Sequence, residues 1–208
     1  YKRDTLPFSQ RFIHRLGVEG RAGYIFQTNP FLEYSNHQYK AMKNAYAGHL
    51  KYSFQLRPHT VADQAYIGAY QGIGVGYFNF GNPEELGNPL AVYLFQGGRI
   101  AQFSPRISLN YEWNFGASFG WKPYDEYDNP ENQIIGSKVN AYLNVNLYLK
   151  WALSPKFDLM IGTTGSHFSN GNTQYPNSGL NTVDCKVGLV YNFNRRADEL
   201  AQSWQHPI

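Results

Sequence analysis

The sequence predicts an all-β protein: an eight-stranded antiparallel up-and-down transmembrane β-barrel with periplasmic termini. Three observations favour this fold. Long segments alternate between apolar and polar residues, eight such segments follow one another, and aromatic residues make up 17% of the 208 residues while charged residues make up only 16%. Soluble domains carry roughly 25% charged residues. The mean hydropathy of −0.50 is nevertheless that of a polar chain, which fits strands that have one polar face.

The alternation is clearest between Ile107 and Trp121, where every odd residue is apolar or aromatic and the even residues are Ser, Asn, Glu or Gly. Segments 139–151 and 183–193 repeat the pattern with few exceptions. Strands of this length exceed the ~5–6 residues usual in soluble domains and cover the ~9–11 residues that a transmembrane strand needs. Trp121 and Trp151 at strand ends fit the aromatic girdles of such barrels.

Eight strands are expected, and the third and fourth are the least regular. They fall at roughly 16–28, 43–57, 64–80, 89–103, 107–121, 138–153, 156–169 and 180–194. The connections after the second, fourth and sixth strands are expected to be short and the others longer. Bacterial barrels have an even number of strands, short periplasmic turns and long outer loops. We therefore expect a periplasmic N-terminal segment 1–15, a barrel over 16–194 and a periplasmic tail 195–208.

The alternative fold is a soluble, lipocalin-like barrel, which would bury its apolar faces inside. Its interior would then have to hold many large side chains, and eight strands leave room for little more than their own side chains. The same narrow interior argues against a porin. These large side chains are Trp113, Phe115, Phe119, Trp121, Trp151 and Tyr191.

Other classes of function are disfavoured by what the chain lacks. It has no run of ~18 apolar residues that could form a membrane-spanning helix. Cys185 is its single cysteine, so neither an internal disulfide nor a cysteine-based zinc site is expected. A net charge of +3 is too small to indicate a nucleic-acid partner. We predict no metal and no cofactor. A signal peptide is not visible at Tyr1, so a mature protein of the bacterial outer membrane is expected, with its signal peptide already removed.

His167 and Ser169 stand two residues apart at the end of the strand expected at 156–169. The apolar odd residues of that strand define its outward face, so both side chains are expected to face lipid at the outer leaflet. Polar groups on that face are costly. A serine becomes a nucleophile when a base takes its proton, and Asn170 could offer an N–H to an oxyanion. Taken alone, the pair also fits polar residues of the membrane interface that have no chemistry.

The stretch His167-Phe168-Ser169-Asn170, followed by Gly171, Pro176-Asn177 and Gly179-Leu180, resembles the C-terminal signature of the outer-membrane lipid A 3-O-deacylases, the PagL-type family. The resemblance extends over about 25 residues, from Gly165 to Leu189. It implies an esterase that removes an ester-linked acyl chain from lipid A of lipopolysaccharide. It further implies His167 as the general base, Ser169 as the nucleophile and Asn170 as the oxyanion helper.

One position departs from the family pattern. The family carries a Glu that orients the histidine, and Asn181 stands there in this chain. Asn181 is expected on the outward face across from His167, whereas Asp184 should point inward. An amide can orient a histidine but cannot stabilise an imidazolium as a carboxylate does. Three possibilities stay open: a slow enzyme, an enzyme that recruits a loop carboxylate, and a catalytically weak or inactive barrel that binds lipopolysaccharide or serves as a structural subunit beside other outer-membrane proteins.

Two further features lie near the expected outer ends of the strands. Lys40, Lys43, Lys122 and Lys138 could pair with the phosphates of lipid A as point charges, or could be ordinary solvated lysines of the rim. The acidic loop 124–132 lacks the spacing of a calcium loop, so a solvated loop is favoured over a cation site.

Overall fold

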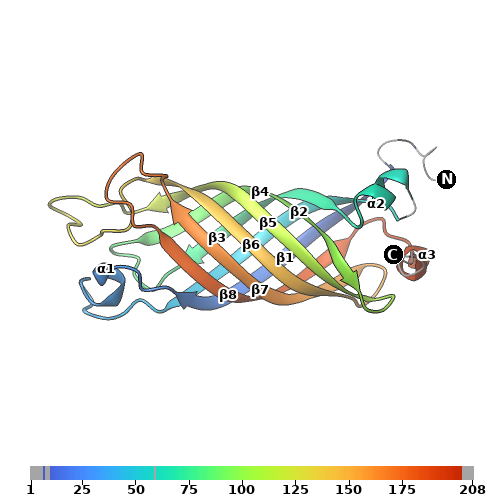
Figure 1. Cartoon of the computed structure of the whole chain (residues 1–208), viewed down its shortest axis with the longest axis horizontal. Helices are drawn as coiled ribbons and strands as arrows, with labels where there is room; N and C mark the ends of the chain where they lie inside the picture. Colours follow the sequence, from blue (N-terminus) through green and yellow to red (C-terminus); the bar gives the residue numbers. More distant parts are fainter. Residues whose placement is uncertain (1–6, 8–9, 59, 203–208) are drawn as a thin grey trace.

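The computed structural model describes residue 7, residues 10–58 and residues 60–202. Its eight strands form one closed antiparallel barrel, in which each strand pairs with its neighbours in chain order and the last closes on the first (Figure 1). This confirms the predicted eight-stranded barrel. The strands are β1 Phe12–Ile25, β2 Asn44–Leu56, β3 Tyr70–Asn79, β4 Gly87–Gln102, β5 Ile107–Trp121, β6 Val139–Ala152, β7 Phe157–Ser169 and β8 Leu180–Asn192.

The described residues also form three short helices at the ends of the barrel: α1 Pro30–Glu33, α2 Val61–Ala65 and α3 Ala197–Gln202. Within the described residues, no helix has the length and the apolar character needed to cross a membrane. Helix α1 lies at one end of the barrel and helices α2 and α3 lie at the other (Figure 1).

The two ends of the barrel differ in the connections and helices that they carry, and we call them the loop end and the terminal end. The loop end carries α1 and the connections 26–43, 80–86, 122–138 and 170–179. The terminal end carries α2, α3, the start of β1, the end of β8, and the connections 57–69, 103–106 and 153–156 (Figure 1).

Two strand boundaries differ from the prediction. β1 begins at Phe12, inside the segment 1–15 that was expected to precede the barrel, because its register with β2 continues down to the pair Phe12 and Leu56. β3 begins at Tyr70, because residues 61–65 form α2, where the Thr60 hydroxyl accepts the backbone N–H of Asp63 at 3.1 Å. The connection after β2 is therefore longer than predicted.

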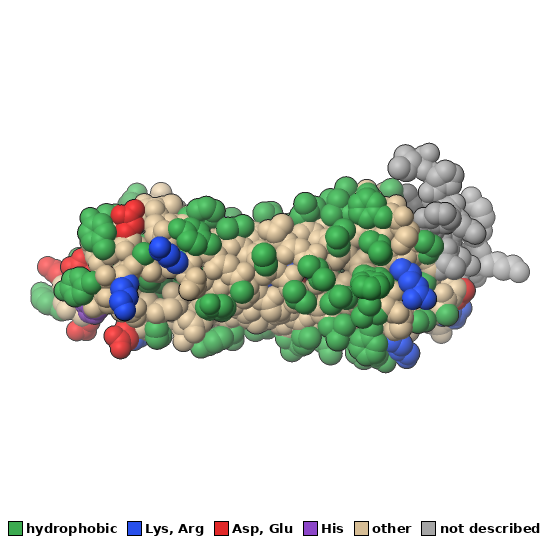
Figure 2. Space-filling model, turned by 90° about the horizontal axis from the view of Figure 1, so that it is seen from below, with side chains coloured by type: hydrophobic (Ala, Val, Ile, Leu, Met, Phe, Trp, Pro, Cys, Tyr) green, Lys and Arg blue, Asp and Glu red, His purple; other side chains and the backbone are tan. Residues whose placement is uncertain are grey.

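The apolar faces of the strands point outward and the polar faces point into the lumen. The end of β5 is an exception: Gly120 has a φ of +88°, and Trp121 after it is 4% exposed and lies in the lumen, so its predicted place in an aromatic girdle is wrong. On β5, Trp113 and Phe115 are 44% and 56% exposed, whereas Asn114 between them is 2% exposed. Figure 2 shows hydrophobic side chains over the body of one face, with charged side chains near the two ends. This arrangement is the opposite of a soluble lipocalin-like barrel, so that alternative is wrong.

Paired charges and hydroxyls fill the middle of the lumen. Glu19 on β1 accepts a bond from Arg21 at 2.6 Å and one from Lys186 at 3.2 Å. Glu112 on β5 accepts from Lys51 and, at 2.9 Å, from the Tyr70 hydroxyl. Buried charges are stable only when paired and hydrogen-bonded, and here each carboxylate has at least two donors.

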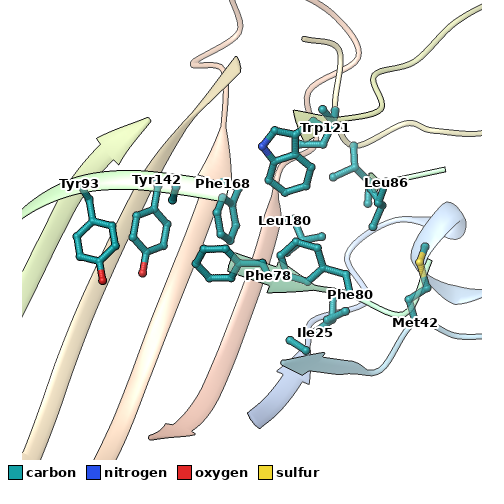
Figure 3. Close-up of a cluster of buried hydrophobic side chains, with 14 of the residues drawn as sticks. Ile25, Met42, Phe78, Phe80, Leu86, Tyr93, Trp121, Tyr142, Phe168 and Leu180 are labelled. Carbon is teal, nitrogen blue, oxygen red and sulfur yellow. The ribbon is translucent and has the colours of Figure 1, made fainter. Parts of the chain in front are cut away.

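An apolar cluster fills the lumen toward the loop end (Figure 3). Aromatic rings from β3, β4, β5, β6 and β7 follow one another along the barrel, and aliphatic side chains from the connections cover them. The labelled members are Tyr93, Tyr142, Phe168, Phe78, Phe80, Trp121, Leu86, Met42, Ile25 and Leu180. This packing fills the lumen at the loop end with side chains and anchors the ends of the strands that carry the candidate site.

Candidate active site

The site lies where β7 ends at the loop end, on the outward face of the barrel. In the register of the sheet, His167 stands opposite Leu143 of β6 and opposite Asn181 of β8. Ser169 is the last residue of β7 and stands opposite Ala141. His167, Ser169 and Asn181 are all partly exposed, whereas Phe168 between the first two is buried. The outward direction predicted for the pair is therefore found.

The three side chains form one hydrogen-bonded row. Nδ1 of His167 lies 2.6 Å from Oδ1 of Asn181, and Nε2 lies 3.1 Å from Oγ of Ser169. The Asn181 oxygen can only accept, so it selects the tautomer with a proton on Nδ1. Nε2 is then unprotonated and faces the serine hydroxyl. This is the geometry that a general base needs toward its nucleophile.

Phe168 holds this part of β7 in place from the inside. Its ring lies 5.1 Å from the ring of Phe78, 5.2 Å from Trp121 and 5.2 Å from Tyr142, all measured between centroids (Figure 3). Because successive residues of a strand point to opposite faces, an anchored Phe168 forces both of its neighbours outward. Sequence reasoning did not assign Phe168 a role, although an aromatic residue between two polar ones on a strand was a signal for it.

Gly179 lets the chain pass close beneath the histidine. Its φ of +73° lies in the left-handed region, which glycine adopts readily. A Cβ there would stand 3.1 Å from the carbonyl oxygen of Phe168 and 3.2 Å from Cε1 of His167. Its backbone N–H donates to the carbonyl of Ile134 at 3.2 Å, which ties this turn to connection 122–138. The sequence showed Gly179 only as part of a family signature, and its contact with His167 appears only in the structure.

Asn170 is largely engaged within the connection that follows Ser169. Its backbone N–H donates to Oδ1 of Asn177 at 3.0 Å, and its side-chain Nδ2 donates to the carbonyl of Gln174 at 2.7 Å. Its Oδ1 is buried and has no hydrogen-bond partner in the described part of the chain. Nδ2 carries two hydrogens and donates one of them to Gln174, so the second N–H of the Asn170 amide remains for another acceptor. Asn177, which fixes this backbone, was quoted in the sequence pattern but given no role.

The group that orients His167 is an amide. Among the described residues, no carboxylate is bonded to the imidazole. Asp184 points inward as predicted, where it is 6% exposed and accepts the Thr182 hydroxyl at 2.8 Å. In the acidic loop, the backbone N–H groups of Asp128 and Tyr127 donate to the Asp125 carboxylate and lower its pKa below the usual value. That carboxylate is thus bonded within its own loop.

The four lysines predicted near the outer rim all lie at the loop end. Lys40 and Lys43 stand in connection 26–43, and Lys122 and Lys138 stand at the two ends of connection 122–138. All four side chains are exposed, and none has an ion-pair partner within the described residues. They lie at the same end of the barrel as Ser169 and are free to meet an anionic ligand.

The comparisons with known proteins concern the family and the fold. The family model described as lipid A 3-O-deacylase (PagL) matches residues 97–190, which include all three members of the hydrogen-bonded row. The crystal structure of the outer membrane enzyme PagL resembles the chain with a TM-score of 0.54 and 14% identity, over 83% of this chain and 97% of that one.

The crystal structure of Neisserial surface protein A resembles the chain with a TM-score of 0.50 and 10% identity, over 88% of this chain and 96% of that one. At such identities both structural likenesses show the fold alone. No curated protein sequence matches the chain.

Proposed function

We propose that this chain, whose residues 97–190 match the model of the lipid A 3-O-deacylase (PagL) family, is an esterase that removes an acyl chain from lipid A at Ser169. The observation that carries the proposal is the continuous row from Asn181 through His167 to Ser169, with contacts of 2.6 Å and 3.1 Å. A nucleophile, a base and a group that orients the base are the three parts that acyl transfer by serine requires.

The reaction takes two steps. Oγ of Ser169 attacks the ester carbonyl carbon while its proton passes to Nε2 of His167, and the resulting imidazolium keeps its Nδ1–H on Asn181. The tetrahedral intermediate collapses, the sugar hydroxyl leaves with the proton from His167, and the acyl group stays on Ser169. Water then attacks the acyl-enzyme, with His167 again taking and returning the proton, and the fatty acid is released. The remaining N–H of Asn170 is the side-chain donor nearest in sequence for the oxyanion.

The position of the row on the wall supports a lipid substrate. Ser169 lies at the end of a membrane-spanning strand and faces away from the lumen, so a water-soluble substrate inside the barrel cannot reach it. The apolar side chains of Leu143 and Val183 flank the row and are 43% and 41% exposed. With the loop end at the cell surface, the ester bonds of lipid A stand at this depth, with acyl chains against the wall and phosphates near the loop-end lysines.

A second candidate function is supported by the chemistry of Asn181. An amide in place of a carboxylate cannot stabilise an imidazolium, and the same change from Asp to Asn in the triad of a serine protease costs ~10⁴ in rate. A barrel of this family with little catalytic power would keep the lipid-facing row and the rim lysines, and it would bind lipopolysaccharide or serve as a structural subunit of an outer-membrane assembly.

Mass spectrometry of lipid A separates the two candidates. Membranes that contain lipopolysaccharide are incubated with the folded protein, with Ser169→Ala and with His167→Ala. The proposal predicts loss of one hydroxyacyl mass with the native chain alone. An unchanged spectrum from a native barrel that is shown to be folded would favour the binding or structural role.

A further inference from the structure

A pocket at the terminal end of the lumen carries more positive charge than its carboxylates can balance, and we propose that it binds one phosphate-class oxyanion. It lies at the opposite end of the barrel from Ser169, so it does not rest on the proposed deacylase function. It is lined by the ends of β1, β2, β4 and β6 and by residues of α2 and α3. The cations that matter most are Arg99, Arg106 and Lys150.

Lys150 is the central cation of this pocket. It stands on β6 with its side chain directed inward, where Arg15, Arg99 and Arg195 are close enough to repel its ammonium group. Asp158 is the nearby opposite charge, but it accepts two bonds from Arg195, at 2.7 Å and 2.8 Å. Among the described residues, the Lys150 ammonium has neither a hydrogen bond nor an ion pair. An ammonium with three donors is therefore left to face the cavity.

The two arginines of the pocket are also incompletely used. Arg99 donates from Nη1 to the neutral oxygen of Gln102 at 3.1 Å, and Arg106 donates from Nη1 to the carbonyl of Leu153 at 3.4 Å. Neither makes an ion pair with a described residue. A guanidinium has five N–H donors in a planar fork that matches an oxyanion. Both side chains thus keep donors for a ligand in the cavity.

The carboxylates of the pocket do not neutralise these cations. Glu199 accepts two bonds from Arg57, at 2.8 Å and 3.0 Å, and one from the backbone N–H of Arg196. Asp63 accepts from the backbone N–H of Gly68 at 3.2 Å. Even if the Asp63 charge is counted fully against Arg99, Arg106 and Lys150, two positive charges remain among the pocket residues that the structure describes.

The size and the chemistry of the cavity point to the class of ligand. Its volume of about 50 Å³ corresponds to roughly four water molecules, at 10–15 Å³ each, which suits a tetrahedral oxyanion. Two unbalanced positive charges that line a small cavity favour an anionic ligand, because bonds between a cationic donor and a phosphate oxygen are among the strongest hydrogen bonds in proteins. The phosphate can be free in solution or can belong to a phospholipid headgroup at the rim.

Isothermal titration calorimetry tests the site. The folded chain, in nanodiscs of phosphatidylcholine, is titrated with inorganic phosphate. We expect saturable binding of one phosphate per barrel, and about tenfold or greater weakening in Lys150→Gln and in Arg106→Gln. Lys156→Gln is the matched control, because Lys156 is an exposed lysine of the same end that does not line the pocket. Its affinity should equal that of the native chain.

The lipid composition then distinguishes the source of the phosphate. In nanodiscs of phosphatidylglycerol, weaker binding of added phosphate would show that headgroups occupy the pocket, and equal binding would assign the pocket to free phosphate. No saturable binding by the native chain in phosphatidylcholine would overturn the proposal. Equal binding by the native chain and by both pocket variants would overturn it as well. Because Arg106 lies in an exposed turn, its variant keeps the test valid if Lys150→Gln does not fold.

Discussion

The outward and inward faces of the barrel use polar residues in opposite ways. In the lumen, Glu19 and Glu112 each meet at least two donors, and their cations are held in turn by these carboxylates. On the wall, the row from Asn181 to Ser169 carries no carboxylate and ends in a partly exposed hydroxyl. In the lumen each of these carboxylates is bonded to cationic or hydroxyl donors, whereas the wall row ends in the Ser169 hydroxyl.

If the proposed function holds, this difference separates polar residues that serve the fold from polar residues that serve chemistry. A barrel whose wall faces lipid must place its polar residues inside, where pairing offsets the cost of burial. A polar row on the lipid face is not stabilised by burial in the lumen. Polar residues in such a place are expected to have a function that offsets their cost. Substitutions on the two faces should therefore separate stability from activity.

The largest effect on the rate of deacylation is expected when the Ser169 hydroxyl is removed. Ser169→Ala should lower deacylation by about 10³-fold or more, because the attacking oxygen is lost, and it should leave the folding of the barrel unchanged. Release of fatty acid from purified lipid A measures the rate, and the shift in gel mobility on heating reports the folded barrel. Full activity in this variant would remove Ser169 from the mechanism.

The next largest effect on the rate is expected when the neutral amide of Asn181 is replaced by a carboxylate. Asn181→Glu should raise kcat by about 10–10³-fold, because a carboxylate stabilises the imidazolium that forms when Ser169 gives up its proton. The measurement is kcat under saturating lipid A, with Asn181→Gln as the uncharged control. If kcat stays unchanged or falls in a folded Asn181→Glu barrel, the amide does not limit the reaction.

A substitution in the lumen should show the opposite behaviour. Glu112→Gln should reduce the free energy of unfolding by about 3–5 kcal/mol, because Lys51 would be left buried without its main partner. The rate per folded barrel should stay at the native value. Urea unfolding in detergent micelles measures the stability, and Glu126→Gln in the exposed acidic loop is the control. A loss of activity without a loss of stability would contradict the separation of the two faces.

Two glycines of connection 170–179 separate backbone strain from contact with His167. Gly179 and Gly171 both have positive φ, but a Cβ at Gly179 would stand 3.2 Å from His167, whereas a Cβ at Gly171 would have no neighbour within 4 Å. Replacing either by Ala should cost about 1–2 kcal/mol of stability through backbone strain. Only Gly179→Ala should also lower the rate, by roughly tenfold, because the imidazole must shift. Equal rates in the two variants would show that the contact with His167 is unimportant.

The smallest effect is expected at the rim. Lys138→Gln should raise KM for lipid A by about 2–5-fold with kcat unchanged, because one exposed charge toward a phosphate is worth little in water. Lys156→Gln at the terminal end should leave KM unchanged. The assay is repeated at high salt, where the difference between the two variants should disappear. A difference that persists at high salt would point to a role other than charge.

The regular strands were predictable because lipid imposes a strict alternation on them. For β5 to β8 the expected bounds agree with the structure to within about two residues, and the outward direction of His167 and Ser169 followed from the parity of the strand. Asp184 was placed inside by the same argument. The lysines were placed at the loop end by the expected order of strands and connections.

The remaining features depend on contacts between distant parts of the chain, which no local pattern contains. The early start of β1 depends on its pairing with β2, and α2 interrupts a segment whose residues also suit a strand. The anchoring of Phe168 needs rings from β3, β5 and β6. The bonds of Asn170 to Gln174 and Asn177 depend on how connection 170–179 folds back on itself.

Labelling with a fluorophosphonate lipid probe tests most directly whether the wall row activates a serine, because the probe reacts with an activated serine and needs no turnover. We expect one probe per folded barrel, attached to the peptide that contains Ser169, with no labelling of Ser169→Ala and little labelling of His167→Ala. Labelling that is equally fast in His167→Ala, or that maps to another serine, would contradict it.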